Sequence, residues 1–104
     1  MNKLRAKKKF GQNFLHDNSV IERIINHFKP QKEDVVYEIG PGHAAITEHL
    51  VQYCQTVNVV EIDNDLVPLL QAKFKNQANL TILHQDALSL ELPAGNNRII
   101  GNLP

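Results

Sequence analysis

Four short segments of this 104-residue chain place glycines, acids or an amide directly after a run of apolar residues. Residues 38–42 are Glu-Ile-Gly-Pro-Gly, residues 61–63 Glu-Ile-Asp, residues 85–87 Gln-Asp-Ala and residues 101–104 Gly-Asn-Leu-Pro. If each apolar run is a strand of one parallel sheet, the four segments meet at its carboxyl edge, where α/β folds bind ligands. The pattern predicts a pocket for a nucleotide-type cofactor, with a methyl-acceptor site beside it.

The glycines and acids suit a ligand that contains a ribose. Gly40 and Gly42 let a strand-to-helix turn approach a ligand closely, although a turn without a ligand shows the same residues. Glu61 lies 21 residues after Gly40, where a carboxylate can accept both hydroxyls of a ribose. Asp86 is spaced to accept from an adenine amine, and alone it would be an ordinary turn aspartate. Glu38 interrupts an apolar strand and, if buried, needs a partner such as the cofactor's amino-acid end or a loop backbone.

Together with the other segments, the last three residues, Asn102, Leu103 and Pro104, predict methyl transfer to an amine, although alone they would be an ordinary loop. The lone pair of an aryl amine such as adenine N6 is delocalised into the ring, so the amine is a poor nucleophile. The Asn102 amide oxygen and a backbone carbonyl, held by the fixed backbone of Pro104, would accept from both N–H groups and localise that lone pair. If the methyl donor is a sulfonium, the leaving group is a neutral thioether and the amine can lose its proton after transfer. The reaction then needs neither a metal nor a strong base.

Periodicity predicts the elements that position these residues. Ser19 with Glu22 is typical of a capping box at the start of a helix, and Asp65 is placed to cap another that buries Leu69. Alternating strands and helices predict an α/β, doubly wound, Rossmann-like fold with a parallel sheet and helices on both faces. Strands are expected at 35–39, 57–62, 80–83 and 98–100, and helices at 20–28, at 44–53 and after residue 65.

The composition fits one soluble domain, with 42% hydrophobic and 21% charged residues and no apolar run near the roughly 20 residues that span a bilayer. The lone cysteine, Cys54, is expected to be a small buried hydrophobe in a reducing cytoplasm. The five histidines lack the spacing of metal ligands, so no metal site is expected.

The net charge of zero hides a basic N-terminal arm, which indicates contact with a nucleic-acid backbone or else a solvated, disordered start. Its basic residues are Lys3, Arg5, Lys7, Lys8 and Lys9.

The chain resembles the N-terminal part of the ribosomal RNA adenine N6-dimethyltransferases, which use S-adenosylmethionine. The resemblance rests on residues 9–15 (Lys-Phe-Gly-Gln-Asn-Phe-Leu) and the four segments above, in the same order over nearly the whole chain. It implies a class I methyltransferase fold, with residues 1–16 as a basic arm and cofactor-contacting loop and 17–104 as a partial cofactor-binding domain. It implies cofactor contacts by Gln12, Asn13, Leu15, Gly40, Gly42, Glu61, Ile62, Asp86, Ala87 and Asn102, catalysis by Asn102, Leu103 and Pro104, and RNA contacts by Arg5, Lys7, Lys8 and Lys9.

The motif at residues 10–15 together with Asn-Leu-Pro is more similar to the small-subunit enzymes, since large-subunit antibiotic-resistance relatives more often have Asn-Ile-Pro. The resemblance therefore implies dimethylation of two adjacent adenines in a hairpin near the 3′ end of 16S RNA and a role in small-subunit biogenesis. It also implies the small ribosomal subunit as partner, and a cytoplasmic, monomeric protein without a metal. Alternatives are a large-subunit methyltransferase, a non-catalytic assembly or transcription factor, and a nicotinamide-dependent oxidoreductase.

Members of that family are much longer, with an aromatic residue directly after the proline, further strands and a C-terminal helical domain. We therefore expect the 104-residue chain to be a fragment that binds cofactor weakly and does not turn over. Its last strand is expected to be an unprotected edge.

Overall fold

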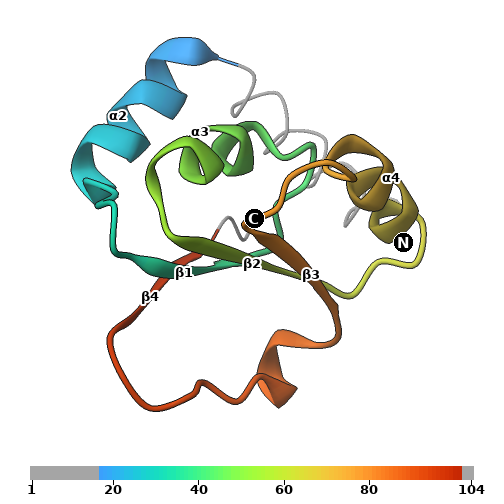
Figure 1. Ribbon diagram of the computed structural model, residues 1–104. Coiled ribbons are helices and arrows are strands. Elements are labelled where there is room, and N and C mark those ends of the chain that lie inside the picture. The colour runs from blue at the N-terminus through green and yellow to red at the C-terminus, as the bar shows by residue number, and fades with distance from the viewer. Residues whose placement is uncertain (1–16, 102–104) are drawn as a thin grey trace.

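A four-stranded parallel sheet is the centre of the computed structural model, which describes residues 17–101 (Figure 1). The strand order is β3-β2-β1-β4, and every neighbouring pair is parallel. This confirms the predicted Rossmann-like parallel sheet. The elements in chain order are α2 (Asn18–Phe28), β1 (Val35–Ile39), α3 (Ala45–Tyr53), β2 (Thr56–Glu61), α4 (Leu66–Lys73), β3 (Leu80–His84), the 3-10 helix η1 (Ala87–Ser89) and β4 (Asn97–Gly101).

The three α-helices lie above the sheet in Figure 1, whereas the connection from β3 to β4 runs below it. Helices were expected on both faces, but within residues 17–101 the second face has only the single turn η1. Pro93 and Gly95 explain the absence of a longer helix in this connection. Proline lacks a backbone N–H, and Gly95 has φ 119°, which a helix cannot contain. None of the helices in the described residues is long and apolar enough to cross a membrane.

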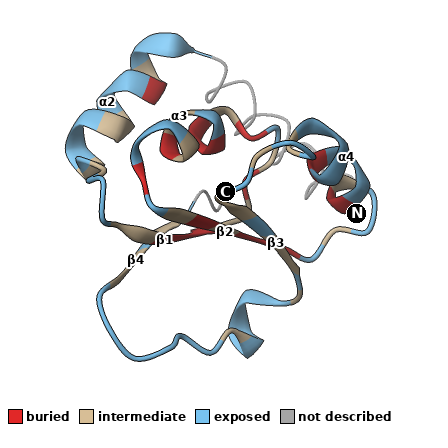
Figure 2. Cartoon of the chain, viewed as in Figure 1, coloured by how far each residue is buried: buried red, intermediate tan, exposed pale blue. Residues whose placement is uncertain are grey.

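The core lies between the sheet and the helices, and Figure 2 shows the buried residues concentrated on β1, β2 and α3. Val36, Val57 and Leu50 are completely buried, and each such side chain contributes about 1.5–3 kcal/mol to folding. The predicted burial of Cys54 is confirmed, and burial raises the pKa of its thiol to about 11. Cys54 therefore serves as a core residue with little thiolate at neutral pH.

Two local predictions were wrong. The N-cap of α2 is Asp17 rather than Ser19, because the Asp17 carboxylate accepts from both the Ser19 N–H (2.9 Å) and the Ser19 hydroxyl (2.7 Å). These hydrogen bonds lower the pKa of Asp17. On α4, Val67 and Leu70 are buried whereas Leu69 is 62% exposed, because this short helix turns only a narrow stripe toward the sheet.

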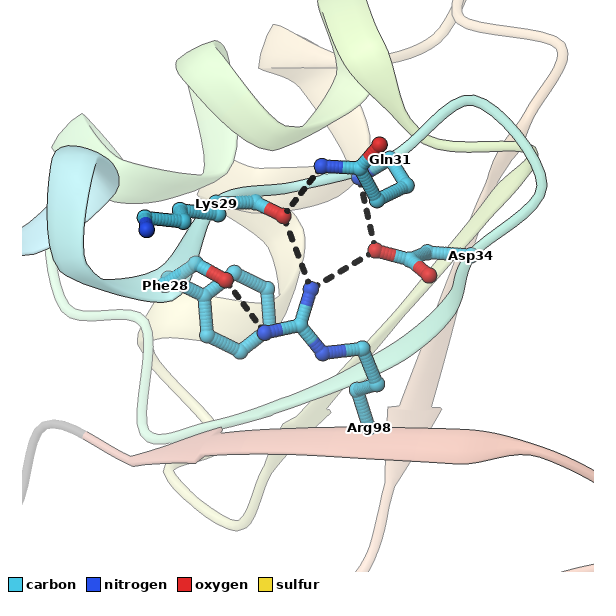
Figure 3. Close-up of polar contacts among 5 residues, drawn as sticks. All are labelled: Phe28, Lys29, Gln31, Asp34 and Arg98. Carbon is cyan, nitrogen blue, oxygen red and sulfur yellow. Dashed lines mark hydrogen bonds and ion pairs between the residues drawn. The ribbon is translucent and has the colours of Figure 1, made fainter.

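Arg98 on β4 fastens the C-terminal end of α2 (Figure 3). Its Nη1 donates to the Lys29 carbonyl (3.1 Å) and to Asp34 Oδ2 (2.8 Å), and Nη2 donates to the Phe28 carbonyl. The guanidinium also lies 3.8 Å from the centre of the Phe28 ring. Although partial burial opposes ionisation of Asp34, the Gln31 N–H and Arg98 hold its pKa below the ordinary value. Arg98 thus supplies the hydrogen bonds that the last helical carbonyls lack.

Replacing Arg98 by methionine is expected to lower the free energy of unfolding by about 2 kcal/mol, because two carbonyls and one carboxylate lose their charged donor. Urea denaturation monitored by circular dichroism measures the change. Arg23→Met, on the exposed side of α2, is the matched control and should change stability by less than about 0.5 kcal/mol. Equal stability of the two variants would show that Arg98 does not fasten α2.

Candidate functional site

The structure brings three of the four polar segments to one edge of the sheet. Ile39 pairs with Val60, and Glu61 pairs with His84, so the residues that follow each strand leave the sheet at the same level. The Gly40 N–H donates to the Val60 carbonyl (3.0 Å), which joins the turn after β1 to the end of β2. Gly101, the last described residue, ends β4 in register with Ile39 at this same edge.

The turn between β1 and α3 has an unusual backbone. Gly40 (φ 65°), Gly42 (φ 59°) and Ala44 (φ 69°) all adopt left-handed conformations. The left-handed region is open to glycine and costs an alanine roughly 1–2 kcal/mol. Among residues 17–101, no side chain caps α3, whose N-cap is Ala44. Because α3 begins directly after the turn that follows β1, its first-turn N–H groups face the carboxyl edge, where they could donate to a ligand.

Glu61 ends β2 with a nearly buried carboxylate, 6% exposed. Its Oε2 accepts the Asp63 N–H at 2.9 Å, and this bond fixes the direction of the carboxylate. The next residue, Ile62, was predicted to continue the strand, but it has left the sheet and is 59% exposed. A fixed acid beside an exposed apolar side chain suits a ligand that has hydroxyls next to a flat ring.

Asp86 follows β3 and is exposed. Its Oδ1 accepts the Leu88 N–H (3.0 Å), and its backbone carbonyl accepts the Ser89 hydroxyl (2.8 Å). Asp86 is therefore the N-cap of η1, and Ala87 is the first residue of this 3-10 helix. The capping bond orients the carboxylate. The predicted contacts of Asp86 and Ala87 with a cofactor stay predictions.

Glu38 on β1 is 1% exposed, and its Oε1 accepts a hydrogen bond from the hydroxyl of Thr47, which is completely buried on α3. Burial raises the pKa of Glu38 to about 7, against the opposing effect of the Thr47 hydrogen bond. Within the described residues the partner of Glu38 is thus a helix side chain and not a loop backbone. Thr47 was missed from the sequence. A polar residue three positions before Leu50, on the buried face of a helix, is the signal that could have found it.

The remaining predicted site residues lie outside the described residues, so their roles stay predictions. The undescribed site residues are Gln12, Asn13 and Leu15 of the predicted cofactor loop, Arg5, Lys7, Lys8 and Lys9 of the basic arm, and Asn102, Leu103 and Pro104.

Within residues 17–101, no group of three or more histidines, cysteines or acids is arranged to hold a metal ion.

Comparison with known proteins identifies relatives of this chain. The ribosomal RNA adenine dimethylase family matches residues 3–104. The "Ribosomal RNA small subunit methyltransferase A" of Coxiella burnetii is 44% identical over 108 aligned residues, covering all of this chain and 42% of its own. The protein of the same name from Marinobacter nauticus is 47% identical, covering 96% of this chain and 38% of its own. The chain thus spans about two fifths of the length of these curated relatives.

Solved structures agree on the fold. The crystal structure of the 23S rRNA methyltransferase ErmE superimposes with a TM-score of 0.77 at 28% identity, covering 82% of this chain and 35% of that one. A dimethyladenosine transferase from Plasmodium falciparum gives a TM-score of 0.73 at 24% identity, covering 83% and 32%. The second likeness shows the fold alone.

Proposed function

Because the chain belongs to the ribosomal RNA adenine dimethylase family, we propose that the carboxyl edge of its sheet binds S-adenosylmethionine for the methylation of adenines in ribosomal RNA. One observation carries this proposal. The left-handed turn from Gly40 to Ala44 follows β1, the oriented carboxylate of Glu61 ends the adjacent β2, and the Gly40–Val60 hydrogen bond joins the two strand ends. A backbone that a ligand can approach and an acid for its ribose therefore lie at neighbouring strand ends.

The residues at this edge fit the cofactor. The hydrogen bond from Asp63 uses Glu61 Oε2, so Oε1 is suited to accept ribose hydroxyls. Ile62 offers an exposed apolar side chain to the adenine ring, and Asp86 an oriented carboxylate to its amine. The Gly40 turn suits the methionine portion. When bound, S-adenosylmethionine supplies an electrophilic methyl group on a positively charged sulfur.

The acceptor side of the proposed site consists of Asn102, Leu103 and Pro104. The Asn102 amide oxygen and a backbone carbonyl of this segment would accept the two N–H groups of adenine N6 and localise the nitrogen lone pair. The amine loses its proton after transfer, so no strong base is required. The role of these residues is to orient the amine and to supply aimed dipoles.

We propose two adjacent adenines in a 3′-terminal hairpin of small-subunit RNA as the substrate, with a role in subunit biogenesis. The names of the relatives at 44% and 47% identity support this choice over the large-subunit alternative, which has the weaker likeness to ErmE at 28%. Hairpin loops suit such an enzyme because their bases can be splayed out of the stack and presented to a pocket. This substrate would place the protein in the cytoplasm, where small subunits are assembled.

The cofactor proposal is tested by an amide NMR titration of the chain with S-adenosylhomocysteine, and with NAD in parallel. We expect saturable shifts at Gly40, Glu61 and Asp86 with the first ligand and none with NAD. Shifts with NAD alone would support the nicotinamide-dependent alternative. A dispersed spectrum that neither ligand changes would contradict the proposed pocket.

The substrate proposal is tested with a chimera in which residues 1–104 replace the matching segment of the Marinobacter nauticus relative. With radiolabelled S-adenosylmethionine we expect N6,N6-dimethyladenosine in unmethylated small subunits and none in large subunits. The same chimera with Asn102→Ala should lose transfer while keeping its circular dichroism spectrum. Label in large-subunit RNA alone would support the large-subunit alternative.

The basic arm is proposed to contact the phosphate backbone of the RNA. Replacing Lys7, Lys8 and Lys9 together by alanine should weaken binding of a 3′-hairpin RNA and reduce the salt slope, the change in log K with log salt concentration, by about 2. Fluorescence anisotropy at several salt concentrations measures this slope. The control replaces Lys29, Lys32 and Lys75, which are exposed in the acidic remainder of the chain. An equal loss of slope in the control would show that the arm makes no special contact.

A further inference from the structure

The turn from Gly40 to Ala44 needs support from the rest of the fold, because three of its five residues have left-handed backbone. Such conformations, including that of Ala44, persist only when surrounding contacts hold them. One candidate support lies on the surface. Lys73 Nζ contacts the His43 carbonyl at 3.4 Å and forms an ion pair with Glu48 at 2.6 Å, but both charged side chains are about half exposed. A solvated contact of this kind contributes little.

The Glu38–Thr47 hydrogen bond crosses the base of the same turn from inside. Glu38 lies two residues before the turn, and its position is fixed because β1 pairs with β2 on one side and β4 on the other. Thr47 lies in the first turn of α3, three residues after the turn ends. Both side chains are almost completely excluded from water, so their bond has no competition from solvent. It closes the loop that contains Gly40 and Gly42.

We propose that Glu38 and Thr47 are positioning residues. Their hydrogen bond holds the start of α3 against the end of β1 and thereby sets the backbone conformation of the turn from Gly40 to Ala44. This inference rests on the proposed function of the turn as part of the S-adenosylmethionine site. Neither residue needs to touch the cofactor. They affect cofactor binding indirectly, because they fix the direction of the α3 N–H groups and the backbone conformation of Gly40 and Gly42.

The test replaces Thr47 by valine, which keeps the shape of the side chain and removes its hydroxyl. Two quantities are measured: the affinity for S-adenosylhomocysteine by calorimetry, and the amide NMR shifts of Gly40 and Gly42 without ligand. We expect about tenfold weaker binding and displaced turn amides, since a buried acceptor loses its donor. Thr47→Ser restores the hydroxyl and should bind within about twofold of the wild-type chain.

The matched control is Asn79→Ala. Asn79 directly precedes β3, and its side chain contacts the C-terminal end of α3, opposite the turn. Asn79 donates to the carbonyls of Val51 (3.0 Å) and Cys54 (3.1 Å), so its loss destabilises the same helix away from the turn. We expect a lower melting temperature in both variants but weaker binding only in Thr47→Val. Equal weakening in both variants, or unchanged turn amides in Thr47→Val, would overturn the inference.

The two proposals fail in different ways. If the wild-type chain does not bind S-adenosylhomocysteine, the proposed cofactor site is wrong, but the ligand-free amides still test the support of the turn. Displacements confined to residues 40–44 in Thr47→Val would then uphold the positioning role. Their absence would overturn it.

Discussion

Replacing Glu61 by alanine should weaken binding of S-adenosylhomocysteine about 100-fold or more. The Glu61 side chain is 6% exposed and is already oriented by the Asp63 N–H, so it loses little conformational entropy when it accepts the ribose hydroxyls. Hydrogen bonds to a charged group contribute about 1.5–3 kcal/mol each, and two of them correspond to a factor of at least 100. Isothermal titration calorimetry measures this loss directly.

The control for Glu61→Ala is Glu33→Ala, an exposed acid just before β1, at the opposite edge of the sheet. It removes the same charge and should leave the affinity within about twofold. Glu61→Gln retains one acceptor oxygen and should lie between the two, about tenfold weaker than wild type. Wild-type affinity in a folded Glu61→Ala variant would remove Glu61 from the site, and with it the main support for a ribose-containing ligand.

The free energy of unfolding is expected to fall by about 3 kcal/mol between pH 4.5 and pH above 7, because of Glu38. Its pKa is about 7 in the folded chain, against 4.5 for an ordinary glutamate. Between these values the folded chain holds a proton that the unfolded chain has released, so stability decreases as the pH rises through this window. Burial is the main cause, and the Thr47 hydrogen bond opposes it only in part.

Urea denaturation at pH 5, 6, 7 and 8 tests this dependence in the wild-type chain and in Glu38→Gln, which cannot titrate. The glutamine variant should show a nearly flat profile, whereas Glu48→Gln, an exposed acid on α3, should follow the wild type. Asp17 and Asp34 have lowered pKa values, so their contributions are lost only under more acidic conditions. Wild-type stability that rises from pH 5 to pH 8 would show that Glu38 is ionised in the folded chain.

The strands could be predicted from the sequence because their signal is local. Apolar runs bounded by turn residues placed β1 at its observed limits and the other strands within about one residue. The one notable boundary difference, at Ile62, has a physical reason: the Glu61 carboxylate turns back to the Asp63 N–H and ends the strand there. That the described polar segments share one edge of the sheet followed from the parallel arrangement alone.

The side-chain contacts between distant elements could not be predicted in the same way. Glu38 was recognised as needing a partner, but the choice of Thr47 depends on how α3 is rotated above β1. Arg98 was taken as part of an apolar strand, and its contacts with Phe28 and Asp34 join segments 64 or more residues apart. Contacts of this kind depend on the packed tertiary structure, which no local pattern encodes.

The position of β4 in the sheet also has a consequence for the nascent chain. Strands β1, β2 and β3, which carry Gly40, Glu61 and Asp86 at their ends, are neighbours in the sheet and leave the ribosome before β4. At roughly 5–20 residues per second, the stretch up to Arg98 follows β3 by about one to three seconds. Until then the carbonyls of Phe28 and Lys29 lack their arginine donor. During synthesis, the cofactor half of the proposed site can therefore form before β4 adds to the sheet, and Asn102 follows β4 along the chain.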